Sequence, residues 1–156
     1  MTSFEAKAWD FLSQEQIAVA GVSGSGQGAA NSIYRKLRDT GYQVFPINPN
    51  AETVEGDTCY PNLKSLPQGV DGVVVVTRPE LTEQIARECV EAGIPRVWMH
   101  YNAFFGPDRT SVSEEAAAMC RDNGITVIAG GCPMMFLEFG HKCMRWLLGV
   151  MGRLPE

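Results

Sequence analysis

Residues 17–29 read IAVAGVSGSGQGA, a run of small apolar residues that passes into a glycine-rich loop and then into a helical pattern. The apolar run is typical of a strand buried on both faces of a sheet. Gly24, Gly26 and Ala29 fit the G-x-G-x-x-[GA] spacing of dinucleotide-binding loops, which alone is weak evidence in a chain with 16 glycines. Its position between a strand and a helix strengthens it, because amide groups at a helix start bind anions. We therefore expect a phosphate or pyrophosphate site here.

The rest of the chain alternates strand and helix patterns around this unit. The expected strands are residues 17–22, 43–47, 72–77, 96–99 and 126–129, and the expected helices are residues 30–40, 81–92 and 112–123. Gly41, Gly93 and Gly124 each sit just past an expected helix, where glycine is the usual terminating residue. The alternation predicts an α/β fold, a Rossmann-like doubly wound parallel sheet with helices on both faces.

We expect residues 1–156 to form a single domain with a core at about residues 10–135. Residues 50–67 are irregular, with a short strand expected near Thr58 and a helical turn near Leu63. Residues 136–151 carry an apolar stripe at helical spacing. The stripe predicts a C-terminal helix that closes a sheet edge, or alternatively a homodimer interface.

Charge and cysteine content narrow the class of protein. Thirteen Lys and Arg against 18 Asp and Glu give a net charge of −5, and no basic cluster indicates a nucleic-acid partner. No apolar run approaches the roughly 20 residues that span a bilayer, and the N-terminus lacks the pattern of a secretory signal. Five scattered cysteines and two histidines lack the spacing of a zinc site, so we expect reduced thiols, no metal and a cytoplasmic location.

The end of the second expected strand discriminates among nucleotides. NAD-binding domains usually place an Asp or Glu there to hold the ribose hydroxyls, but this chain has Asn48 and Pro49. A ligand with a phosphorylated ribose, such as coenzyme A or NADP, would not be repelled. Arg35, Lys36 and Arg38 on the preceding helix are typical of solvated helix charges.

Six motifs then occur in an order that resembles a known family. They are VAGVS at 19–23, GYQVFPINP at 41–49, GDTCY at 56–60, VDGVVV at 70–75, GIPRVW at 93–98 and GGCP at 130–133. The chain resembles the small stand-alone CoA-binding domain proteins, which are similar to the N-terminal domain of the succinyl-CoA synthetase alpha subunit. The resemblance covers about residues 10–135, and GYQVFPINP is its most specific part. Residues 99–103, MHYNA, depart from the Gln-x-Gly type of sequence that many relatives have after the tryptophan.

The resemblance implies a protein that binds coenzyme A or acyl-CoA, with the CoA pyrophosphate on the glycine-rich loop. It does not imply the ligase reaction, and we expect no catalytic residue. The residues it implies in CoA binding are Gly21, Val22, Ser23, Gly24, Ser25, Gly26, Gln27, Gly28, Asn48, Pro49, Thr77, Arg78, Pro79, Trp98 and Cys132. Two of these have alternatives: Trp98 either stacks on the ligand or belongs to the core, and Cys132 is either a thiol beside the CoA thiol or a small packed residue. The alternative function is an NAD(P)-binding oxidoreductase-type domain.

Overall fold

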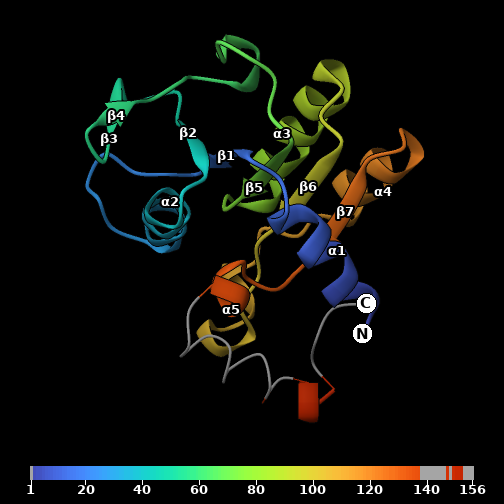
Figure 1. Cartoon of the computed structure of the whole chain (residues 1–156). Helices are drawn as coiled ribbons and strands as arrows, with labels where there is room; N and C mark the ends of the chain where they lie inside the picture. Colours follow the sequence, from blue (N-terminus) through green and yellow to red (C-terminus); the bar gives the residue numbers. More distant parts are fainter. Residues whose placement is uncertain (1, 138–146, 148, 153–156) are drawn as a thin grey trace.

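The computed structural model describes residues 2–137, 147 and 149–152. Its central sheet contains β1 (Gln16–Ala20), β2 (Gln43–Ile47), β5 (Gly72–Val75), β6 (Arg96–Met99) and β7 (Thr126–Ala129), as Figure 1 shows. Neighbouring strands follow the order β2-β1-β5-β6-β7, and every pair in it is parallel. Later strands are thus added on both sides of β1: β2 on one side, and β5, β6 and β7 on the other. This order confirms the predicted Rossmann-like doubly wound architecture.

Three of these strands have the predicted bounds, and the other two end earlier. The expected strand 17–22 ends at Ala20, because Gly21 turns the chain out of the strand with a φ of 101°. The expected strand 72–77 ends at Val75. Both shortened ends lie beside each other in the sheet, since Val76 donates its amide hydrogen to the Ala20 carbonyl at 2.9 Å. The chain thus leaves the sheet at the same level after β1 and after β5.

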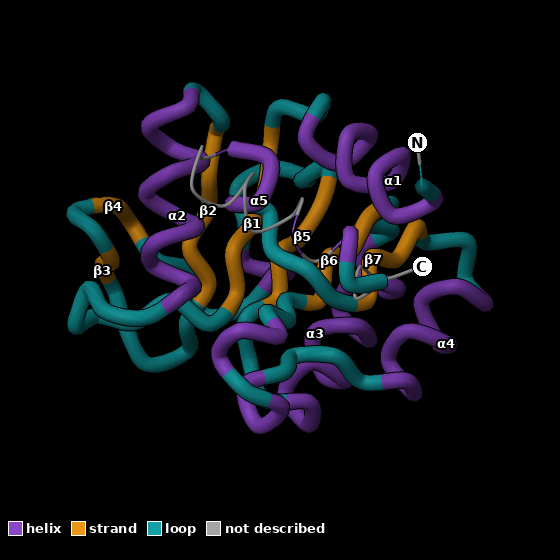
Figure 2. The backbone as a smooth tube through the Cα atoms, turned by 90° about the horizontal axis from the view of Figure 1, so that it is seen from below, coloured by secondary structure: helices purple, strands orange, loops and turns teal. Residues whose placement is uncertain are grey.

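Helices cover both faces of the sheet, as Figure 2 shows. The predicted helices are α2 (Ala29–Thr40), α3 (Pro79–Ala92) and α4 (Glu114–Asp122). α2 lies with α1 (Ser3–Leu12) and α5 (Met134–Leu137) on one face, and α3 and α4 cover the other. Gly41 and Gly93 end α2 and α3 in the left-handed conformation, with φ values of 109° and 69°. The two faces bury separate apolar clusters.

Helix α1 is a part of the core that our sequence interpretation missed. Thr2 accepts a hydrogen bond from the Glu5 amide and the Glu5 side chain accepts one from the Thr2 amide, which is a capping box. Phe4 and Phe11 are buried, with ring centroids 6.1 and 5.5 Å from that of Trp98. The core therefore extends back to Phe4, beyond the predicted limit near residue 10.

The irregular region contains the two expected small elements. β3 (Thr53–Val54) and β4 (Asp57–Thr58) form an antiparallel hairpin, and η1 (Leu63–Ser65) is the helical turn. Two further turns, η2 (Ala103–Phe105) and η3 (Pro107–Arg109), follow β6. Most of the predicted helix 136–151 lies outside the described residues. Among the helices that are described, none has both the length and the apolar character to cross a bilayer.

Candidate functional site

The loops that follow the parallel strands gather at one edge of the sheet. The backbone amide of Gly21 donates to the Ile47 carbonyl at 3.3 Å, and the backbone amide of His100 donates to the Val75 carbonyl at 2.9 Å. β2 and β5 flank β1, and the chain reverses its direction of winding between β1 and β5. In open α/β sheets this crevice at the carboxyl ends of the strands is where ligands bind.

Gly21 is required by packing at this crevice. A Cβ atom at position 21 would lie 2.0 Å from the Val76 carbonyl oxygen, and φ is 101°. No L side chain fits there. Gly21 therefore lets the ends of β1 and β5 approach each other, and the ligand contact that the resemblance implies for it stays a prediction.

The first turn of α2 is open to a ligand. Its N-cap residue, Gly28, provides no side-chain hydrogen bond, and the turn contains no acidic residue. By contrast, α1 has a capping box, Ser113 caps α4, and α3 has Glu80 in its first turn. The amide groups and positive dipole end of α2 therefore form a site that favours an anion.

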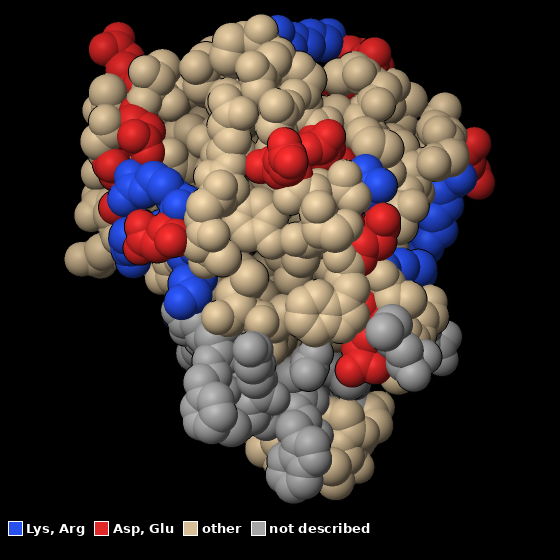
Figure 3. Space-filling model, viewed as in Figure 1, with Lys and Arg blue, Asp and Glu red and all other residues tan. Residues whose placement is uncertain are grey.

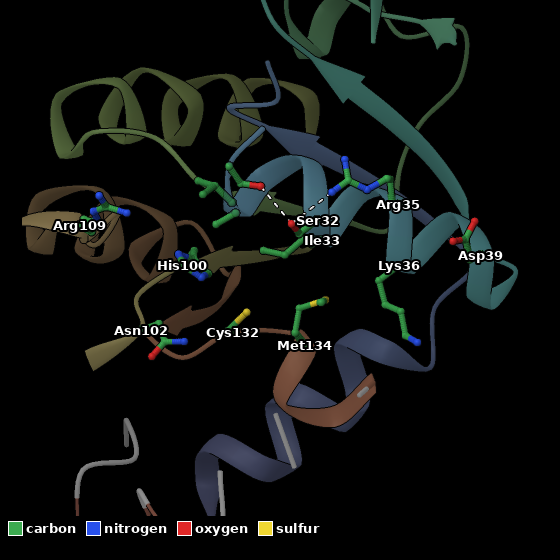
Figure 4. A pocket seen from close by; sticks show the side chains of 13 residues that line it. Ser32, Ile33, Arg35, Lys36, Asp39, His100, Asn102, Arg109, Cys132 and Met134 are labelled. Atoms are coloured by element: carbon green, nitrogen blue, oxygen red, sulfur yellow. Dashed lines mark hydrogen bonds between the residues drawn. The ribbon is translucent and has the colours of Figure 1, made fainter. Parts of the chain in front are cut away.

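A pocket of about 950 Å³ opens beside this turn (Figure 4). Its walls come from α2 and from the segments after β5, β6 and β7. The lining residues are Gly28, Ala29, Ser32, Ile33, Arg35, Lys36, Asp39, Val76, His100, Asn102, Arg109, Cys132 and Met134. In Figure 4, Arg109, His100 and Asn102 stand at one end and Arg35, Lys36 and Asp39 at the other, with Ser32, Ile33, Cys132 and Met134 between them. The volume is at the upper end of the roughly 300–1,000 Å³ of small-molecule sites.

The pocket has a positive excess although the chain is acidic. Arg35, Lys36 and Arg109 line it against one carboxylate, Asp39. His100 is 6% exposed, and burial lowers its pKa to about 4, so the imidazole is neutral at neutral pH. The charge distribution suits an anionic ligand.

The structure brings only part of the predicted site together. Gly28 and Cys132 line the pocket, and Cys132 is 4% exposed. Asn48 points its amide into the protein, donating to the Val22 carbonyl at 2.7 Å while its Oδ1 accepts from the Asn50 amide at 2.7 Å. Through its hydrogen bond to Val22, the Asn48 side chain holds the backbone at the start of the glycine-rich loop.

Two other predicted residues are engaged in the fold. The Thr77 hydroxyl lies 2.9 Å from that of the buried Thr82 on α3. Trp98 has no exposed surface, packs among Phe4, Phe11 and Phe136, and donates its indole N–H to the Gly130 carbonyl at 2.9 Å. Of its two alternatives, Trp98 therefore takes the core position and is not available to stack on a ligand.

Arg35 and Arg38 were expected to be solvated helix charges; their side chains are 40% and 37% exposed, and each is also paired with a carboxylate. Arg35 Nη1 lies 2.7 Å from Glu55 Oε1, and Arg38 Nη1 lies 2.8 Å from Asp57 Oδ2. Both carboxylates belong to the β3–β4 hairpin. On the left side of Figure 3, where Figure 1 places this hairpin and α2, positive and negative side chains lie next to one another. The sequence signal was the spacing of Asn31, Arg35 and Arg38, which places all three on one face of the helix.

Comparison with known proteins identifies the family of this chain. The family model described as "CoA binding domain" matches residues 15–138. The chain belongs to this CoA-binding domain family. The matched residues include β1, the glycine-rich loop and every residue that lines the pocket.

Two relatives of similar length share most of this CoA-binding domain. The uncharacterized protein YneT of Bacillus subtilis is 29% identical over 118 residues, which cover 76% of this chain and 82% of YneT. A solved structure of a hypothetical protein from Pyrococcus horikoshii is 26% identical, with a TM-score of 0.76 over 87% of this chain and 92% of that one. In both relatives the matched region makes up most of the chain.

The CoA-binding domain is also similar to part of larger enzymes. The alpha subunit of the ADP-forming acetate–CoA ligase II of Pyrococcus furiosus is 26% identical over 125 residues, which are 78% of this chain but 27% of that subunit. The match therefore leaves most of the ligase subunit without a counterpart in this chain.

Proposed function

We propose that this protein binds coenzyme A or an acyl-CoA reversibly, holding the CoA pyrophosphate at the first turn of α2. The observation that carries the proposal is that an uncapped helix start with no acidic residue opens into a pocket lined by three cations and one carboxylate. Membership of the CoA-binding domain family supports the choice of ligand.

In this proposal the pantetheine arm runs from α2 toward the ends of β6 and β7. Cys132 and Met134 lie midway along the pocket, and His100 and Asn102 lie at its far end. The imidazole of His100, which is neutral at neutral pH, could exchange hydrogen bonds with the amide groups of a pantetheine chain without carrying a charge. The protein then acts as a binder without a catalytic residue, in the cytoplasm that the sequence predicts.

The alternative, an NAD(P)-binding oxidoreductase-type domain, has less support. The residue after β2 is Asn48, and both ends of its side-chain amide are already bonded within the protein. A carboxylate that could hold the two ribose hydroxyls of NAD is missing from that position.

Calorimetric titration with CoA, acetyl-CoA, NADP and NAD at equal concentrations tests the proposal. We expect CoA and acetyl-CoA to bind and NAD to bind at least tenfold more weakly, a difference of about 1.4 kcal/mol. Tighter binding of NADP than of CoA would overturn the proposed function in favour of the oxidoreductase alternative.

A further inference from the structure

The glycine-rich loop is held in place by the side chain of Asn31, which has no exposed surface. Asn31 on α2 accepts the Ser23 amide hydrogen at 2.7 Å and donates to the Ser23 carbonyl at 2.8 Å. Its Nδ2 group also donates to Glu55 Oε1 at 3.0 Å. One amide thus fixes the backbone of the loop at Ser23 and connects it to the hairpin.

Glu55 connects a second point of the loop to the same hairpin. Its Oε1 atom accepts from Arg35 Nη1 at 2.7 Å, and the same nitrogen donates to the Gly26 carbonyl at 2.9 Å. The hydrogen bond from Asn31, followed by that from Arg35, lowers the pKa of Glu55, so the carboxylate is ionised at neutral pH. Asn31, Arg35 and Glu55 together form what we call the loop-holding triad.

The backbone at Glu55 indicates that the carboxylate is not there for the hairpin itself. Glu55 and Gly56 have φ values of 53° and 80°, as in the two-residue turns that join antiparallel strands. Asn is favoured at the first of these positions, and Glu adopts a left-handed conformation at a cost. A residue that is unfavourable for its own turn and contacts a binding loop is a functional candidate.

We propose that Glu55 is a positioning residue for ligand binding: through Asn31 and Arg35 it holds residues 23–28 in the conformation that receives the phosphate. This inference rests on the proposed function. A loop that is ordered before the ligand arrives avoids the loss of conformational entropy on binding, so Glu55 raises affinity although it does not line the pocket.

The substitution Glu55→Asn separates the two roles of the position. It removes the carboxylate while supplying the residue that the hairpin turn prefers, so we expect a melting temperature equal to or above that of the unmodified protein. We expect CoA to bind about tenfold more weakly, because charge-assisted hydrogen bonds are lost. Amide hydrogen exchange in residues 23–28 of the ligand-free protein should become faster.

Two further variants complete the set. Glu55→Gln keeps an oxygen that can accept from Asn31 and Arg35, so it should restore most of the affinity, to within about threefold. Glu52→Asn makes the same charge change at an exposed residue whose side chain has no hydrogen bond or ion pair among the described residues. This matched control should bind CoA as the unmodified protein does.

The outcomes distinguish this inference from the proposed function. Absence of CoA binding by the unmodified protein would contradict the proposed function, and the exchange rates of the ligand-free variants would still judge the triad. If Glu55→Asn exchanges and binds like the unmodified protein, the positioning role is wrong. Should Glu55→Asn melt at a lower temperature, Arg35→Met removes the same contact from the helix side, and unchanged exchange in residues 23–28 would then overturn the inference.

Discussion

A carboxylate placed at the start of α2 should oppose ligand binding while favouring the fold. Ala29 is exposed, is the first residue of α2 and lines the pocket, so the side chain of Ala29→Glu would stand beside the proposed phosphate position. At about 5 Å and an effective dielectric constant of about 20 to 80, two unit charges repel by about 1–3 kcal/mol. This corresponds to a dissociation constant for CoA that is about 5- to 150-fold higher.

The same carboxylate should stabilise the free protein. An acidic residue in the first turn of a helix contributes about 0.3–1 kcal/mol. For a chain of this size that is a rise of about 1–3 °C in the melting temperature. Calorimetric titration and thermal melting of the same preparations measure both effects.

Ala6→Glu provides the matched control, because Ala6 is exposed on α1 and does not line the pocket. It changes the net charge equally and should leave the affinity for CoA within about twofold, since exposed charges beyond about 10 Å are screened. If Ala29→Glu binds CoA as tightly as Ala6→Glu does, the pyrophosphate does not lie at the start of α2 and the reasoning fails.

Three more expectations concern single residues. Burial lowers the pKa of His100 from 6.5 to about 4, so between these pH values the unfolded chain binds more protons than the folded protein does. The free energy of unfolding should therefore fall by about 2 kcal/mol from pH 7 to pH 5. In urea unfolding, the variant His100→Gln should not show this loss. Gly21→Ala should destabilise the protein by about 2–4 kcal/mol, because the added methyl group would overlap the Val76 carbonyl. Gly24→Ala should melt within about 2 °C of the unmodified protein, because no atom lies within 4 Å of its added methyl group. Equal melting temperatures of the two variants would refute the packing argument. Mild oxidation with diamide in the presence of CoA should join the thiols of Cys132 and CoA as a disulfide, with the two electrons reducing the diamide. Proteolysis and mass spectrometry should locate the CoA on the Cys132 peptide. An adduct on another peptide would place the CoA thiol outside the pocket.

Local patterns in the sequence were sufficient for most of the backbone. The strand 43–47 and the glycines at 41 and 93 were predicted correctly, because periodicity and terminating residues are properties of neighbouring positions. Thr2 and Glu5 carried a readable signal for α1 as well, a capping box that our interpretation did not use. The proposed anion site at the turn at Gly28 also rests on chain-local features, a glycine-rich loop followed by a helix.

The partners of the polar side chains were decided only by the tertiary structure. Asn31 and Glu55 are 24 residues apart in sequence, and nothing in their spacing indicates that they meet beside the glycine-rich loop. Asn48 could equally have faced a ribose, and Trp98 a ligand, until packing placed one under Val22 and the other among Phe4 and Phe11. The physical reason is that a strand or helix pattern constrains the backbone of adjacent residues, whereas a side chain's partner depends on which distant elements the sheet order brings beside it.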